Sequence, residues 1–88
     1  MKLPEGPDAY ELERIIMHYS ALVELRASDE DRDEAEELVA RIDTEIQTAL
    51  DSPTKHRDWK AARPRIEQLV TQLDQLLYYQ QPESMEGA

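Results

Sequence analysis

Apolar residues recur at intervals of three and four in three stretches of this chain, and no stretch of useful length alternates with a period of two. Spacing of three and four places apolar side chains along one face of an α-helix, whereas a half-buried strand needs the period of two. The sequence therefore predicts three amphipathic helices and no sheet. From the three apolar faces we expect a common core formed by Leu12, Ile16, Tyr19, Leu38, Ile42, Ile46, Ile66, Leu69 and Leu73.

Capping residues and a proline set the ends of the predicted helices. Asp8 precedes the first apolar face and Glu11 follows three positions later, which is the arrangement of a reciprocal capping box. Ser28 precedes the second face, with Asp31 at the matching third position. Pro53 disfavours helical angles at the residue before it and so ends the second helix. We expect helices over residues 9–27, 29–51 and 58–80.

Pro64 lies inside the third predicted helix, on its outward side. A proline in a helix interior costs about 3 kcal/mol, and far less within the first turn. Two solutions fit: a helix from about Asp58 that is kinked at Pro64, or a short helical turn followed by a helix that starts at Arg63. The apolar spacing keeps its phase across the proline, from Trp59 to Leu76, which favours the kinked helix.

The length of 88 residues allows one domain at most. Three amphipathic helices joined by short turns are typical of an all-α fold, here a small antiparallel three-helix bundle over residues 1–80. The segment 81–88 has nothing to bury and is expected to be a disordered tail. No signal-like apolar run follows the first residues, and the longest apolar segment is too short to cross a bilayer. We therefore expect a cytoplasmic protein that does not bind membranes.

The first predicted helix has apolar residues on its back as well as on its core face. Tyr10, Met17, Ala21 and Leu25 lie opposite the core face, together with Arg14. A helix that is apolar nearly all round is usually buried all round, and the other two helices can cover only one side of it. This back face is therefore a candidate docking surface for another chain. The alternative is that a central helix needs a wide apolar face and simply exposes a few large residues.

Charge is distributed unevenly along the chain, whose net charge is −10. Residues 29–51 hold ten acidic and two basic residues, and seven of the acids fall within nine positions: Asp29, Glu30, Asp31, Asp33, Glu34, Glu36 and Glu37. Carboxylates in a first helical turn are stabilised by the helix dipole, but acids four positions apart repel each other. The run Lys55–Arg65 carries five cations and one acid, although cations at a helix N-terminus oppose the dipole. In an antiparallel bundle these two runs lie at opposite ends.

Residues for catalysis, metal binding or cofactor binding do not form a pattern. The chain has no cysteine, no glycine-rich phosphate loop, and no third ligand near His18 or near the pair His56 and Asp58. We therefore expect no cofactor and no enzymatic activity, with a small helical enzyme as the third choice of function. Trp59 belongs to the apolar face of the third helix, although its basic neighbours would also suit a stacking or anchoring role.

Acidity and an unpaired apolar face together suggest a protein that acts by binding another protein. The first interpretation is an interaction module that binds a basic partner, such as a nucleic-acid-binding protein, through the acidic second helix, and inhibits or regulates it. The alternative is a structural subunit that forms a homo-oligomer through the back of the first helix. The net charge argues against direct binding of duplex nucleic acid or of an anionic membrane.

Overall fold

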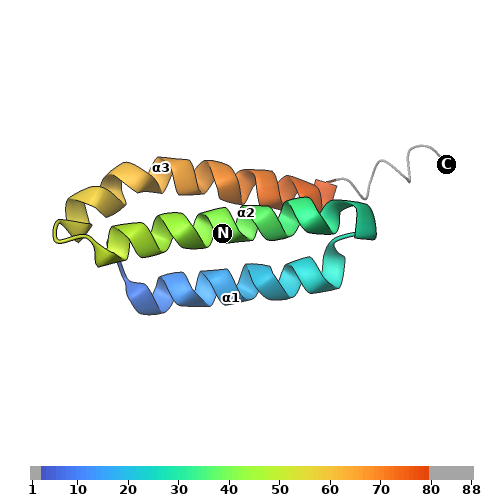
Figure 1. Cartoon of the computed structure of the whole chain (residues 1–88), viewed down its shortest axis with the longest axis horizontal. Coiled ribbons are helices and arrows are strands. Elements are labelled where there is room, and N and C mark those ends of the chain that lie inside the picture. Colours follow the sequence, from blue (N-terminus) through green and yellow to red (C-terminus); the bar gives the residue numbers. More distant parts are fainter. Residues whose placement is uncertain (1–2, 80–88) are drawn as a thin grey trace.

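The computed structural model describes residues 3–79 of the chain, and within this range it contains helices and no strand. Helix α1 spans Ala9–Arg26, α2 spans Asp29–Asp51 and α3 spans Lys55–Asp74, and a short π-helical turn, η1, follows at Gln75–Tyr79. The three long helices run antiparallel to their chain neighbours, with α2 in the middle (Figure 1). The predicted all-α three-helix bundle is confirmed. The predicted tail, residues 81–88, and the last residue of the third predicted helix lie outside the described residues.

None of the helices between residues 3 and 79 combines the length and apolar character needed to cross a membrane.

The first two helices begin at the predicted caps. The Asp8 carboxylate accepts a hydrogen bond from the backbone N–H of Glu11 at 3.2 Å, and the Ser28 hydroxyl accepts one from the N–H of Asp31 at 3.3 Å. The reciprocal half of the first capping box does not form. The Asp8 N–H already donates to the Gly6 carbonyl oxygen at 2.8 Å, and the Glu11 carboxylate pairs with Arg14 at 3.5 Å instead.

Helix α3 begins at Lys55, three residues before the predicted start. Asp58 is not the first helical residue, because its carboxylate reaches back to the turn and accepts hydrogen bonds from the hydroxyls of Ser52 and Thr54. The Ser52 hydroxyl in turn accepts the Thr54 N–H at 3.1 Å. These contacts allow a three-residue connection, Ser52–Thr54, to reverse the chain between α2 and α3.

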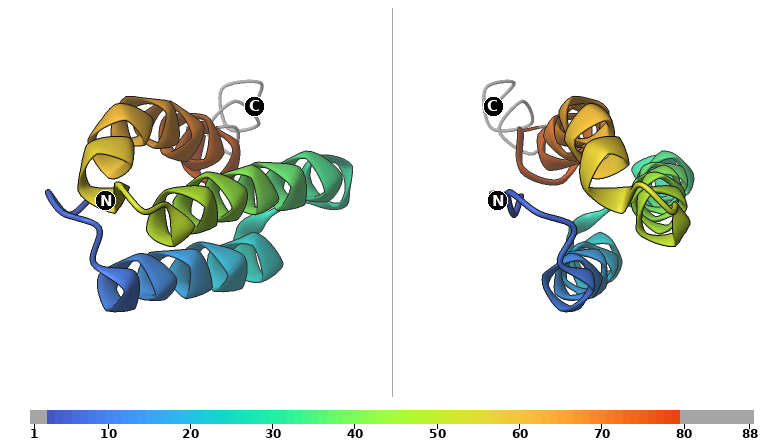
Figure 2. Two further views of the ribbon diagram at one scale, coloured as in Figure 1. Left: turned by 60° about the vertical axis from the view of Figure 1, so that its left-hand side comes forward. Right: turned by 90° about the vertical axis from the view of Figure 1, so that its left-hand side faces the viewer.

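Pro64 is an interior residue of a continuous α3, as the unbroken apolar phase predicted. Its ring lies on the exposed side of the helix, so it does not displace any core residue. A proline lacks the N–H of the normal helical hydrogen bond and crowds the preceding turn, which bends a helix. Figure 2 shows that the axis of α3 changes direction over its N-terminal half.

The core lies where α1 and α3 pack against α2. Most of the predicted core residues are buried, and Trp59 is completely buried, so it belongs to the core rather than to a surface that could stack a base. Ile16 and Leu69 were predicted as core but are only partly buried, because each lies at the edge of a seam between two helices. Leu76 and Leu77 are consecutive and both buried, since the wider π-turn directs both inward.

A segment before α1 completes the core, and no pattern in the sequence predicted this. We call residues 3–8 the N-terminal strap. Leu3 is only 3% exposed, the Trp59 indole N–H donates to the carbonyl oxygen of Pro4 at 3.2 Å, and Arg63 donates to the carbonyl oxygen of Leu3 at 3.5 Å. Figure 2 shows the strap leaving the start of α1 and running toward α3. It therefore joins two helices whose backbones do not pack against each other.

We expect truncation of Ile42 to cost far more stability than truncation of Leu69. Ile42 is 1% exposed in the centre of α2, so Ile42→Ala should lower the free energy of unfolding by about 2–5 kcal/mol. Leu69→Ala removes a side chain that is only partly buried and should cost clearly less, because its cavity opens to solvent. Urea unfolding followed by circular dichroism measures both. Equal losses would contradict the burial assigned to these two positions.

The strap should contribute to stability through Leu3. We expect Leu3→Ala to lower the free energy of unfolding by about 2–5 kcal/mol, the usual cost for a buried leucine. The matched control is Gly6→Ala in the same segment. A Cβ at Gly6 would meet no atom within 4 Å, and its φ is not positive, so this change should leave stability unchanged or raise it by up to about 1 kcal/mol. If both variants unfolded at the parent's urea concentration, the strap would not be part of the core.

Candidate functional site

The seven clustered carboxylates form one end of the molecule, which we call the acidic end: residues 29–37 in the first turns of α2. All seven side chains except that of Asp31 are exposed, and Asp31 accepts a hydrogen bond from the Ser28 hydroxyl at 3.1 Å. Within residues 3–79, the single ion pair recorded for this cluster joins Glu37 to Arg41 at 3.9 Å, with both side chains about two-thirds exposed. An exposed pair of this length contributes little to stability.

The acidic end holds more negative charge than helix capping requires. Asp29 and Glu30 occupy the first turn, where the helix dipole stabilises negative charge. Asp33 and Glu37 continue the same charge one and two turns further, where the dipole has little effect. Acids four positions apart on a helix repel by roughly 0.2–0.5 kcal/mol per pair. Among residues 3–79, the acidic end therefore carries repulsion that the recorded ion pairs relieve only at Glu37.

The back of α1 is open to solvent over its whole length. Tyr10 is 71% exposed, Met17 64% and Leu25 80%, and Ala21 is exposed as well. The opposite side of the helix is buried, through Leu12, Ile15, Tyr19 and Val23. The structure thus places all four predicted residues on one uncovered stripe. The C-terminal end of α1, which carries Leu25, adjoins the start of α2 and thus the acidic end, whereas Tyr10 is at the N-terminal end of α1. Figure 1 shows these two ends of α1 at opposite ends of the bundle.

The basic run lies at the opposite end from the acidic run and is largely engaged in structural contacts. Arg65 donates from Nε and Nη2 to Glu45 Oε1 at 3.4 and 3.1 Å, which ties α3 to α2. Arg63 holds the strap, and Arg57 contacts the turn through Thr54 and Asp58. Three of the five cations of this run are therefore held by contacts within the folded chain, whereas Lys55 and Lys60 are exposed.

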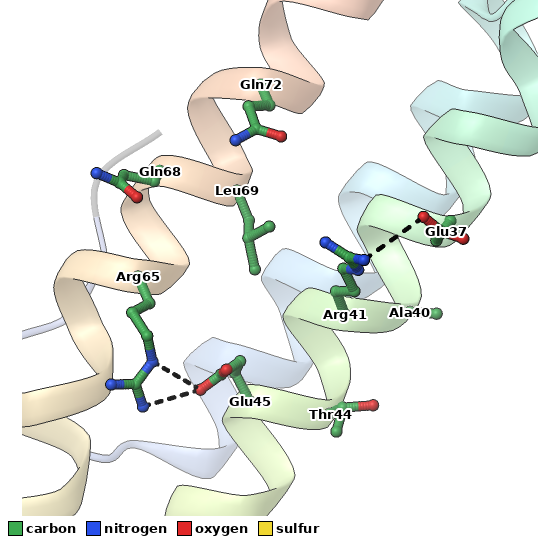
Figure 3. Close-up of a pocket in the computed structure, with 9 residues that line it drawn as sticks. All are labelled: Glu37, Ala40, Arg41, Thr44, Glu45, Arg65, Gln68, Leu69 and Gln72. Atoms are coloured by element: carbon green, nitrogen blue, oxygen red, sulfur yellow. Dashed lines mark hydrogen bonds and ion pairs between the residues drawn. The ribbon is translucent and has the colours of Figure 1, made fainter.

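A groove of about 500 Å³ runs between α2 and α3 (Figure 3). Leu69 points into it from α3, and Ala40 provides space on α2. The charged side chains along the groove largely pair with each other, Glu37 with Arg41 and Glu45 with Arg65. Leu69 was predicted to be a core residue, and this groove was not predicted. The one feature of the sequence that could have indicated the groove was Ala40, a small residue on the outward side of α2.

Polar groups inside the bundle serve structural contacts. The Tyr19 hydroxyl donates to Asp74 Oδ1 at 2.9 Å, and burial, followed by the hydrogen bond to this carboxylate, raises the pKa of Tyr19 above its ordinary range. A phenol held protonated in this way cannot serve as a base at neutral pH. No group of three or more potential metal ligands occurs among residues 3–79.

Comparisons of this chain with protein-family models, with curated proteins and with solved structures found no match.

The turn before α3 should make stability depend on pH. The hydrogen bond from the Ser52 hydroxyl lowers the pKa of Asp58; desolvation opposes this effect, and Thr54 and Arg57 add to it. A depressed pKa stabilises the fold above the ordinary pKa of the carboxyl group, and this stabilisation is lost as the pH falls through the lower, folded-state value.

We therefore expect Asp58→Asn to be less stable than the parent at neutral pH, with a difference that shrinks under strongly acidic conditions. Urea unfolding in a buffer series from about pH 7 to about pH 2 measures the difference. Ser52→Ala should reproduce part of the same pH dependence, because it removes the main hydrogen bond. A difference that stays constant down to the lowest pH would show that the Asp58 charge does not matter.

Proposed function

We propose that this protein is a non-enzymatic interaction module that binds a basic surface of a partner protein through the acidic end of α2 and thereby inhibits or regulates that partner. The observation that carries the proposal is that the carboxylates of this cluster are exposed and largely unpaired. Six of its carboxylates are exposed, and the single ion pair recorded for it within residues 3–79 is long and exposed. A cationic surface would relieve a repulsion that the bundle leaves in place.

The charge distribution supports binding that begins with electrostatic attraction. The net charge of −10 gives the molecule a strong negative field, and the acidic end concentrates that field at one place. Complementary charge raises the association rate more than the affinity, and added salt screens it. A partner that presents lysine and arginine to nucleic acid would offer such a surface, which makes nucleic-acid-binding proteins suitable targets.

Self-association through the back of α1 is the second candidate, and the exposure of Tyr10, Met17 and Leu25 favours it. Large apolar side chains aligned on one helix face are typical of protein interfaces. Light scattering of the parent and of Met17→Glu with Leu25→Lys separates the two candidates. A dimeric parent and a monomeric, fully helical variant would support self-association.

We expect the triple reversal Asp33→Lys, Glu34→Lys and Glu37→Lys to abolish rapid, salt-sensitive binding of a basic partner. The partner is first captured from cell extract on the immobilised parent protein, then purified, and its association rate is measured by surface plasmon resonance at several salt concentrations. The fold should remain intact, because all three side chains are exposed.

The matched control reverses three exposed acids at the other end of the molecule, Glu5, Glu11 and Asp51. It changes the net charge by the same amount, so it should slow association only slightly. If the two triple variants slowed association equally, net charge alone would explain binding and the acidic end would not be the site. If the reversal of Asp33, Glu34 and Glu37 left binding at low salt unchanged, the proposal would be wrong.

A further inference from the structure

The seam between α1 and α2 holds two hollows of about 150 Å³ each along its outer side. The first is lined by Glu13 and Ile16 of α1 and by Asp43 and Leu50 of α2, among others. Ile16 and Leu50 are partly buried side chains that pack against the core, so their uncovered parts form an apolar floor.

The second hollow continues the first along the same seam. It is lined by Ser20 and Glu24 of α1 and by Glu36 and Val39 of α2. The lining residues recur every three or four positions on each helix, which places both hollows on one flank of each helix. We call the two together the α1/α2 groove. It extends along α1 from Ala9 to Glu24, which is about 22 Å or four helical turns.

Unpaired negative charge lines both sides of this groove. Each hollow has one carboxylate from each helix, Glu13 with Asp43 and Glu24 with Glu36, and its lining includes no lysine or arginine. None of these four carboxylates takes part in an ion pair recorded within residues 3–79. The α2/α3 groove differs, because arginines on its walls pair with the acids beside them.

Exposed apolar surface adjoins the groove on α1. Met17 follows Glu13 by four positions and precedes Ser20 by three, so it lies on the same flank of the helix as both. It is 64% exposed and lines neither hollow, and it lies beyond Glu13 and Glu24 on the back of α1. Between its two rows of carboxylates, the α1/α2 groove offers a narrow floor, about four turns long, formed mainly by the uncovered parts of Ile16, Val39 and Leu50.

We propose that the α1/α2 groove binds one amphipathic helix of the basic partner, with lysine or arginine on both flanks of that helix's apolar face. An apolar face with anchors every three or four residues fits a groove of this shape and length. Cations on both flanks of the partner's helix would lie opposite the carboxylates on both walls of the groove. The proposal rests on the proposed function and specifies which element of the partner is bound.

A second copy of this chain does not fit the groove. Its exposed apolar stripe runs along the back of α1, and Glu13 and Glu24 border that stripe. Docking the stripe into the groove would place carboxylates of one copy against carboxylates of the other. Like charges at close range oppose association, so the complementary occupant is a basic helix from a different protein.

The test uses three synthetic labelled peptides of about four to five helical turns. The first is an amphipathic leucine–lysine helix with lysine on both flanks, the second has the same composition in scrambled order, and the third replaces lysine with glutamate. Fluorescence anisotropy with the full chain measures affinity. We expect the amphipathic lysine peptide to bind at least tenfold more tightly than the scrambled one, and the glutamate peptide not to bind.

Neutral variants then locate the site. Glu13→Gln with Asp43→Asn should weaken binding of the amphipathic lysine peptide at least tenfold. The control, Glu11→Gln with Glu67→Gln, removes the same charge from other faces and should change affinity less than twofold. In methyl spectra of the complex, the signals of Ile16, Val39 and Leu50 should shift, whereas that of Leu69 in the α2/α3 groove should not.

The outcomes separate this proposal from the proposed function. One set of results would identify the acidic end as the site and contradict the groove proposal. In that case both lysine peptides would bind equally, Glu13→Gln with Asp43→Asn would have no effect, and the reversal of Asp33, Glu34 and Glu37 would abolish binding. If neither lysine peptide bound, or if the glutamate peptide bound as well as the lysine peptide, both proposals would fall. Methyl shifts confined to Leu69 would also overturn the groove proposal.

Discussion

The apolar face of α2 is the interaction on which the rest of the structure depends. Both α1 and α3 pack against it, whereas the backbones of α1 and α3 do not pack against each other. Its residues Ile42 and Ile46 are each 1% exposed, so the two neighbouring helices together cover this face almost completely. Because two neighbours share one helix face, all remaining surface of α2 faces solvent. This surface carries most of the chain's excess negative charge.

Packing through one central helix leaves the gap between α1 and α3 to be closed by other means. Tyr19 of α1 reaches Asp74 of α3, and Arg26 donates from Nε to the carbonyl oxygen of Leu77 at 3.2 Å while its guanidinium lies over the Tyr78 ring. The strap closes the other end through Leu3. Each contact uses a polar atom at the edge of an apolar core, which satisfies buried groups that would otherwise be costly.

Local signals in the sequence predict the elements of this fold but not the contacts that close it. The periodicity and the caps Asp8 and Ser28 identify α1 and α2 because they act within a few residues. The contacts of the strap could not be predicted, since Trp59, which bonds Pro4, and Arg63, which bonds Leu3, each lie more than fifty residues away in the chain. Leu69 was assigned to the core because spacing gives the face of a residue but not its depth. For the same reason, the acidic run was visible in the sequence, whereas the position of Glu13 opposite Asp43 across the α1/α2 seam was not.

The long reach of the contacts that hold α1 has a consequence for the order of folding. The hydrogen bonds from Tyr19, Arg26 and Trp59 close loops of 55, 51 and 55 residues, whereas α2 and α3 are joined by a three-residue turn. Both turns are short, with two residues between α1 and α2 and three between α2 and α3, but α3 has the more extensive contact with α2. We therefore expect the α2–α3 hairpin to form first and α1 to dock last. The segments that dock last are also the first to detach in local opening of the native state. A molecule bound between α1 and α2 would therefore stabilise the bundle by keeping α1, its most weakly held helix, in place. The amides of α1 would then be the first to gain protection from hydrogen exchange.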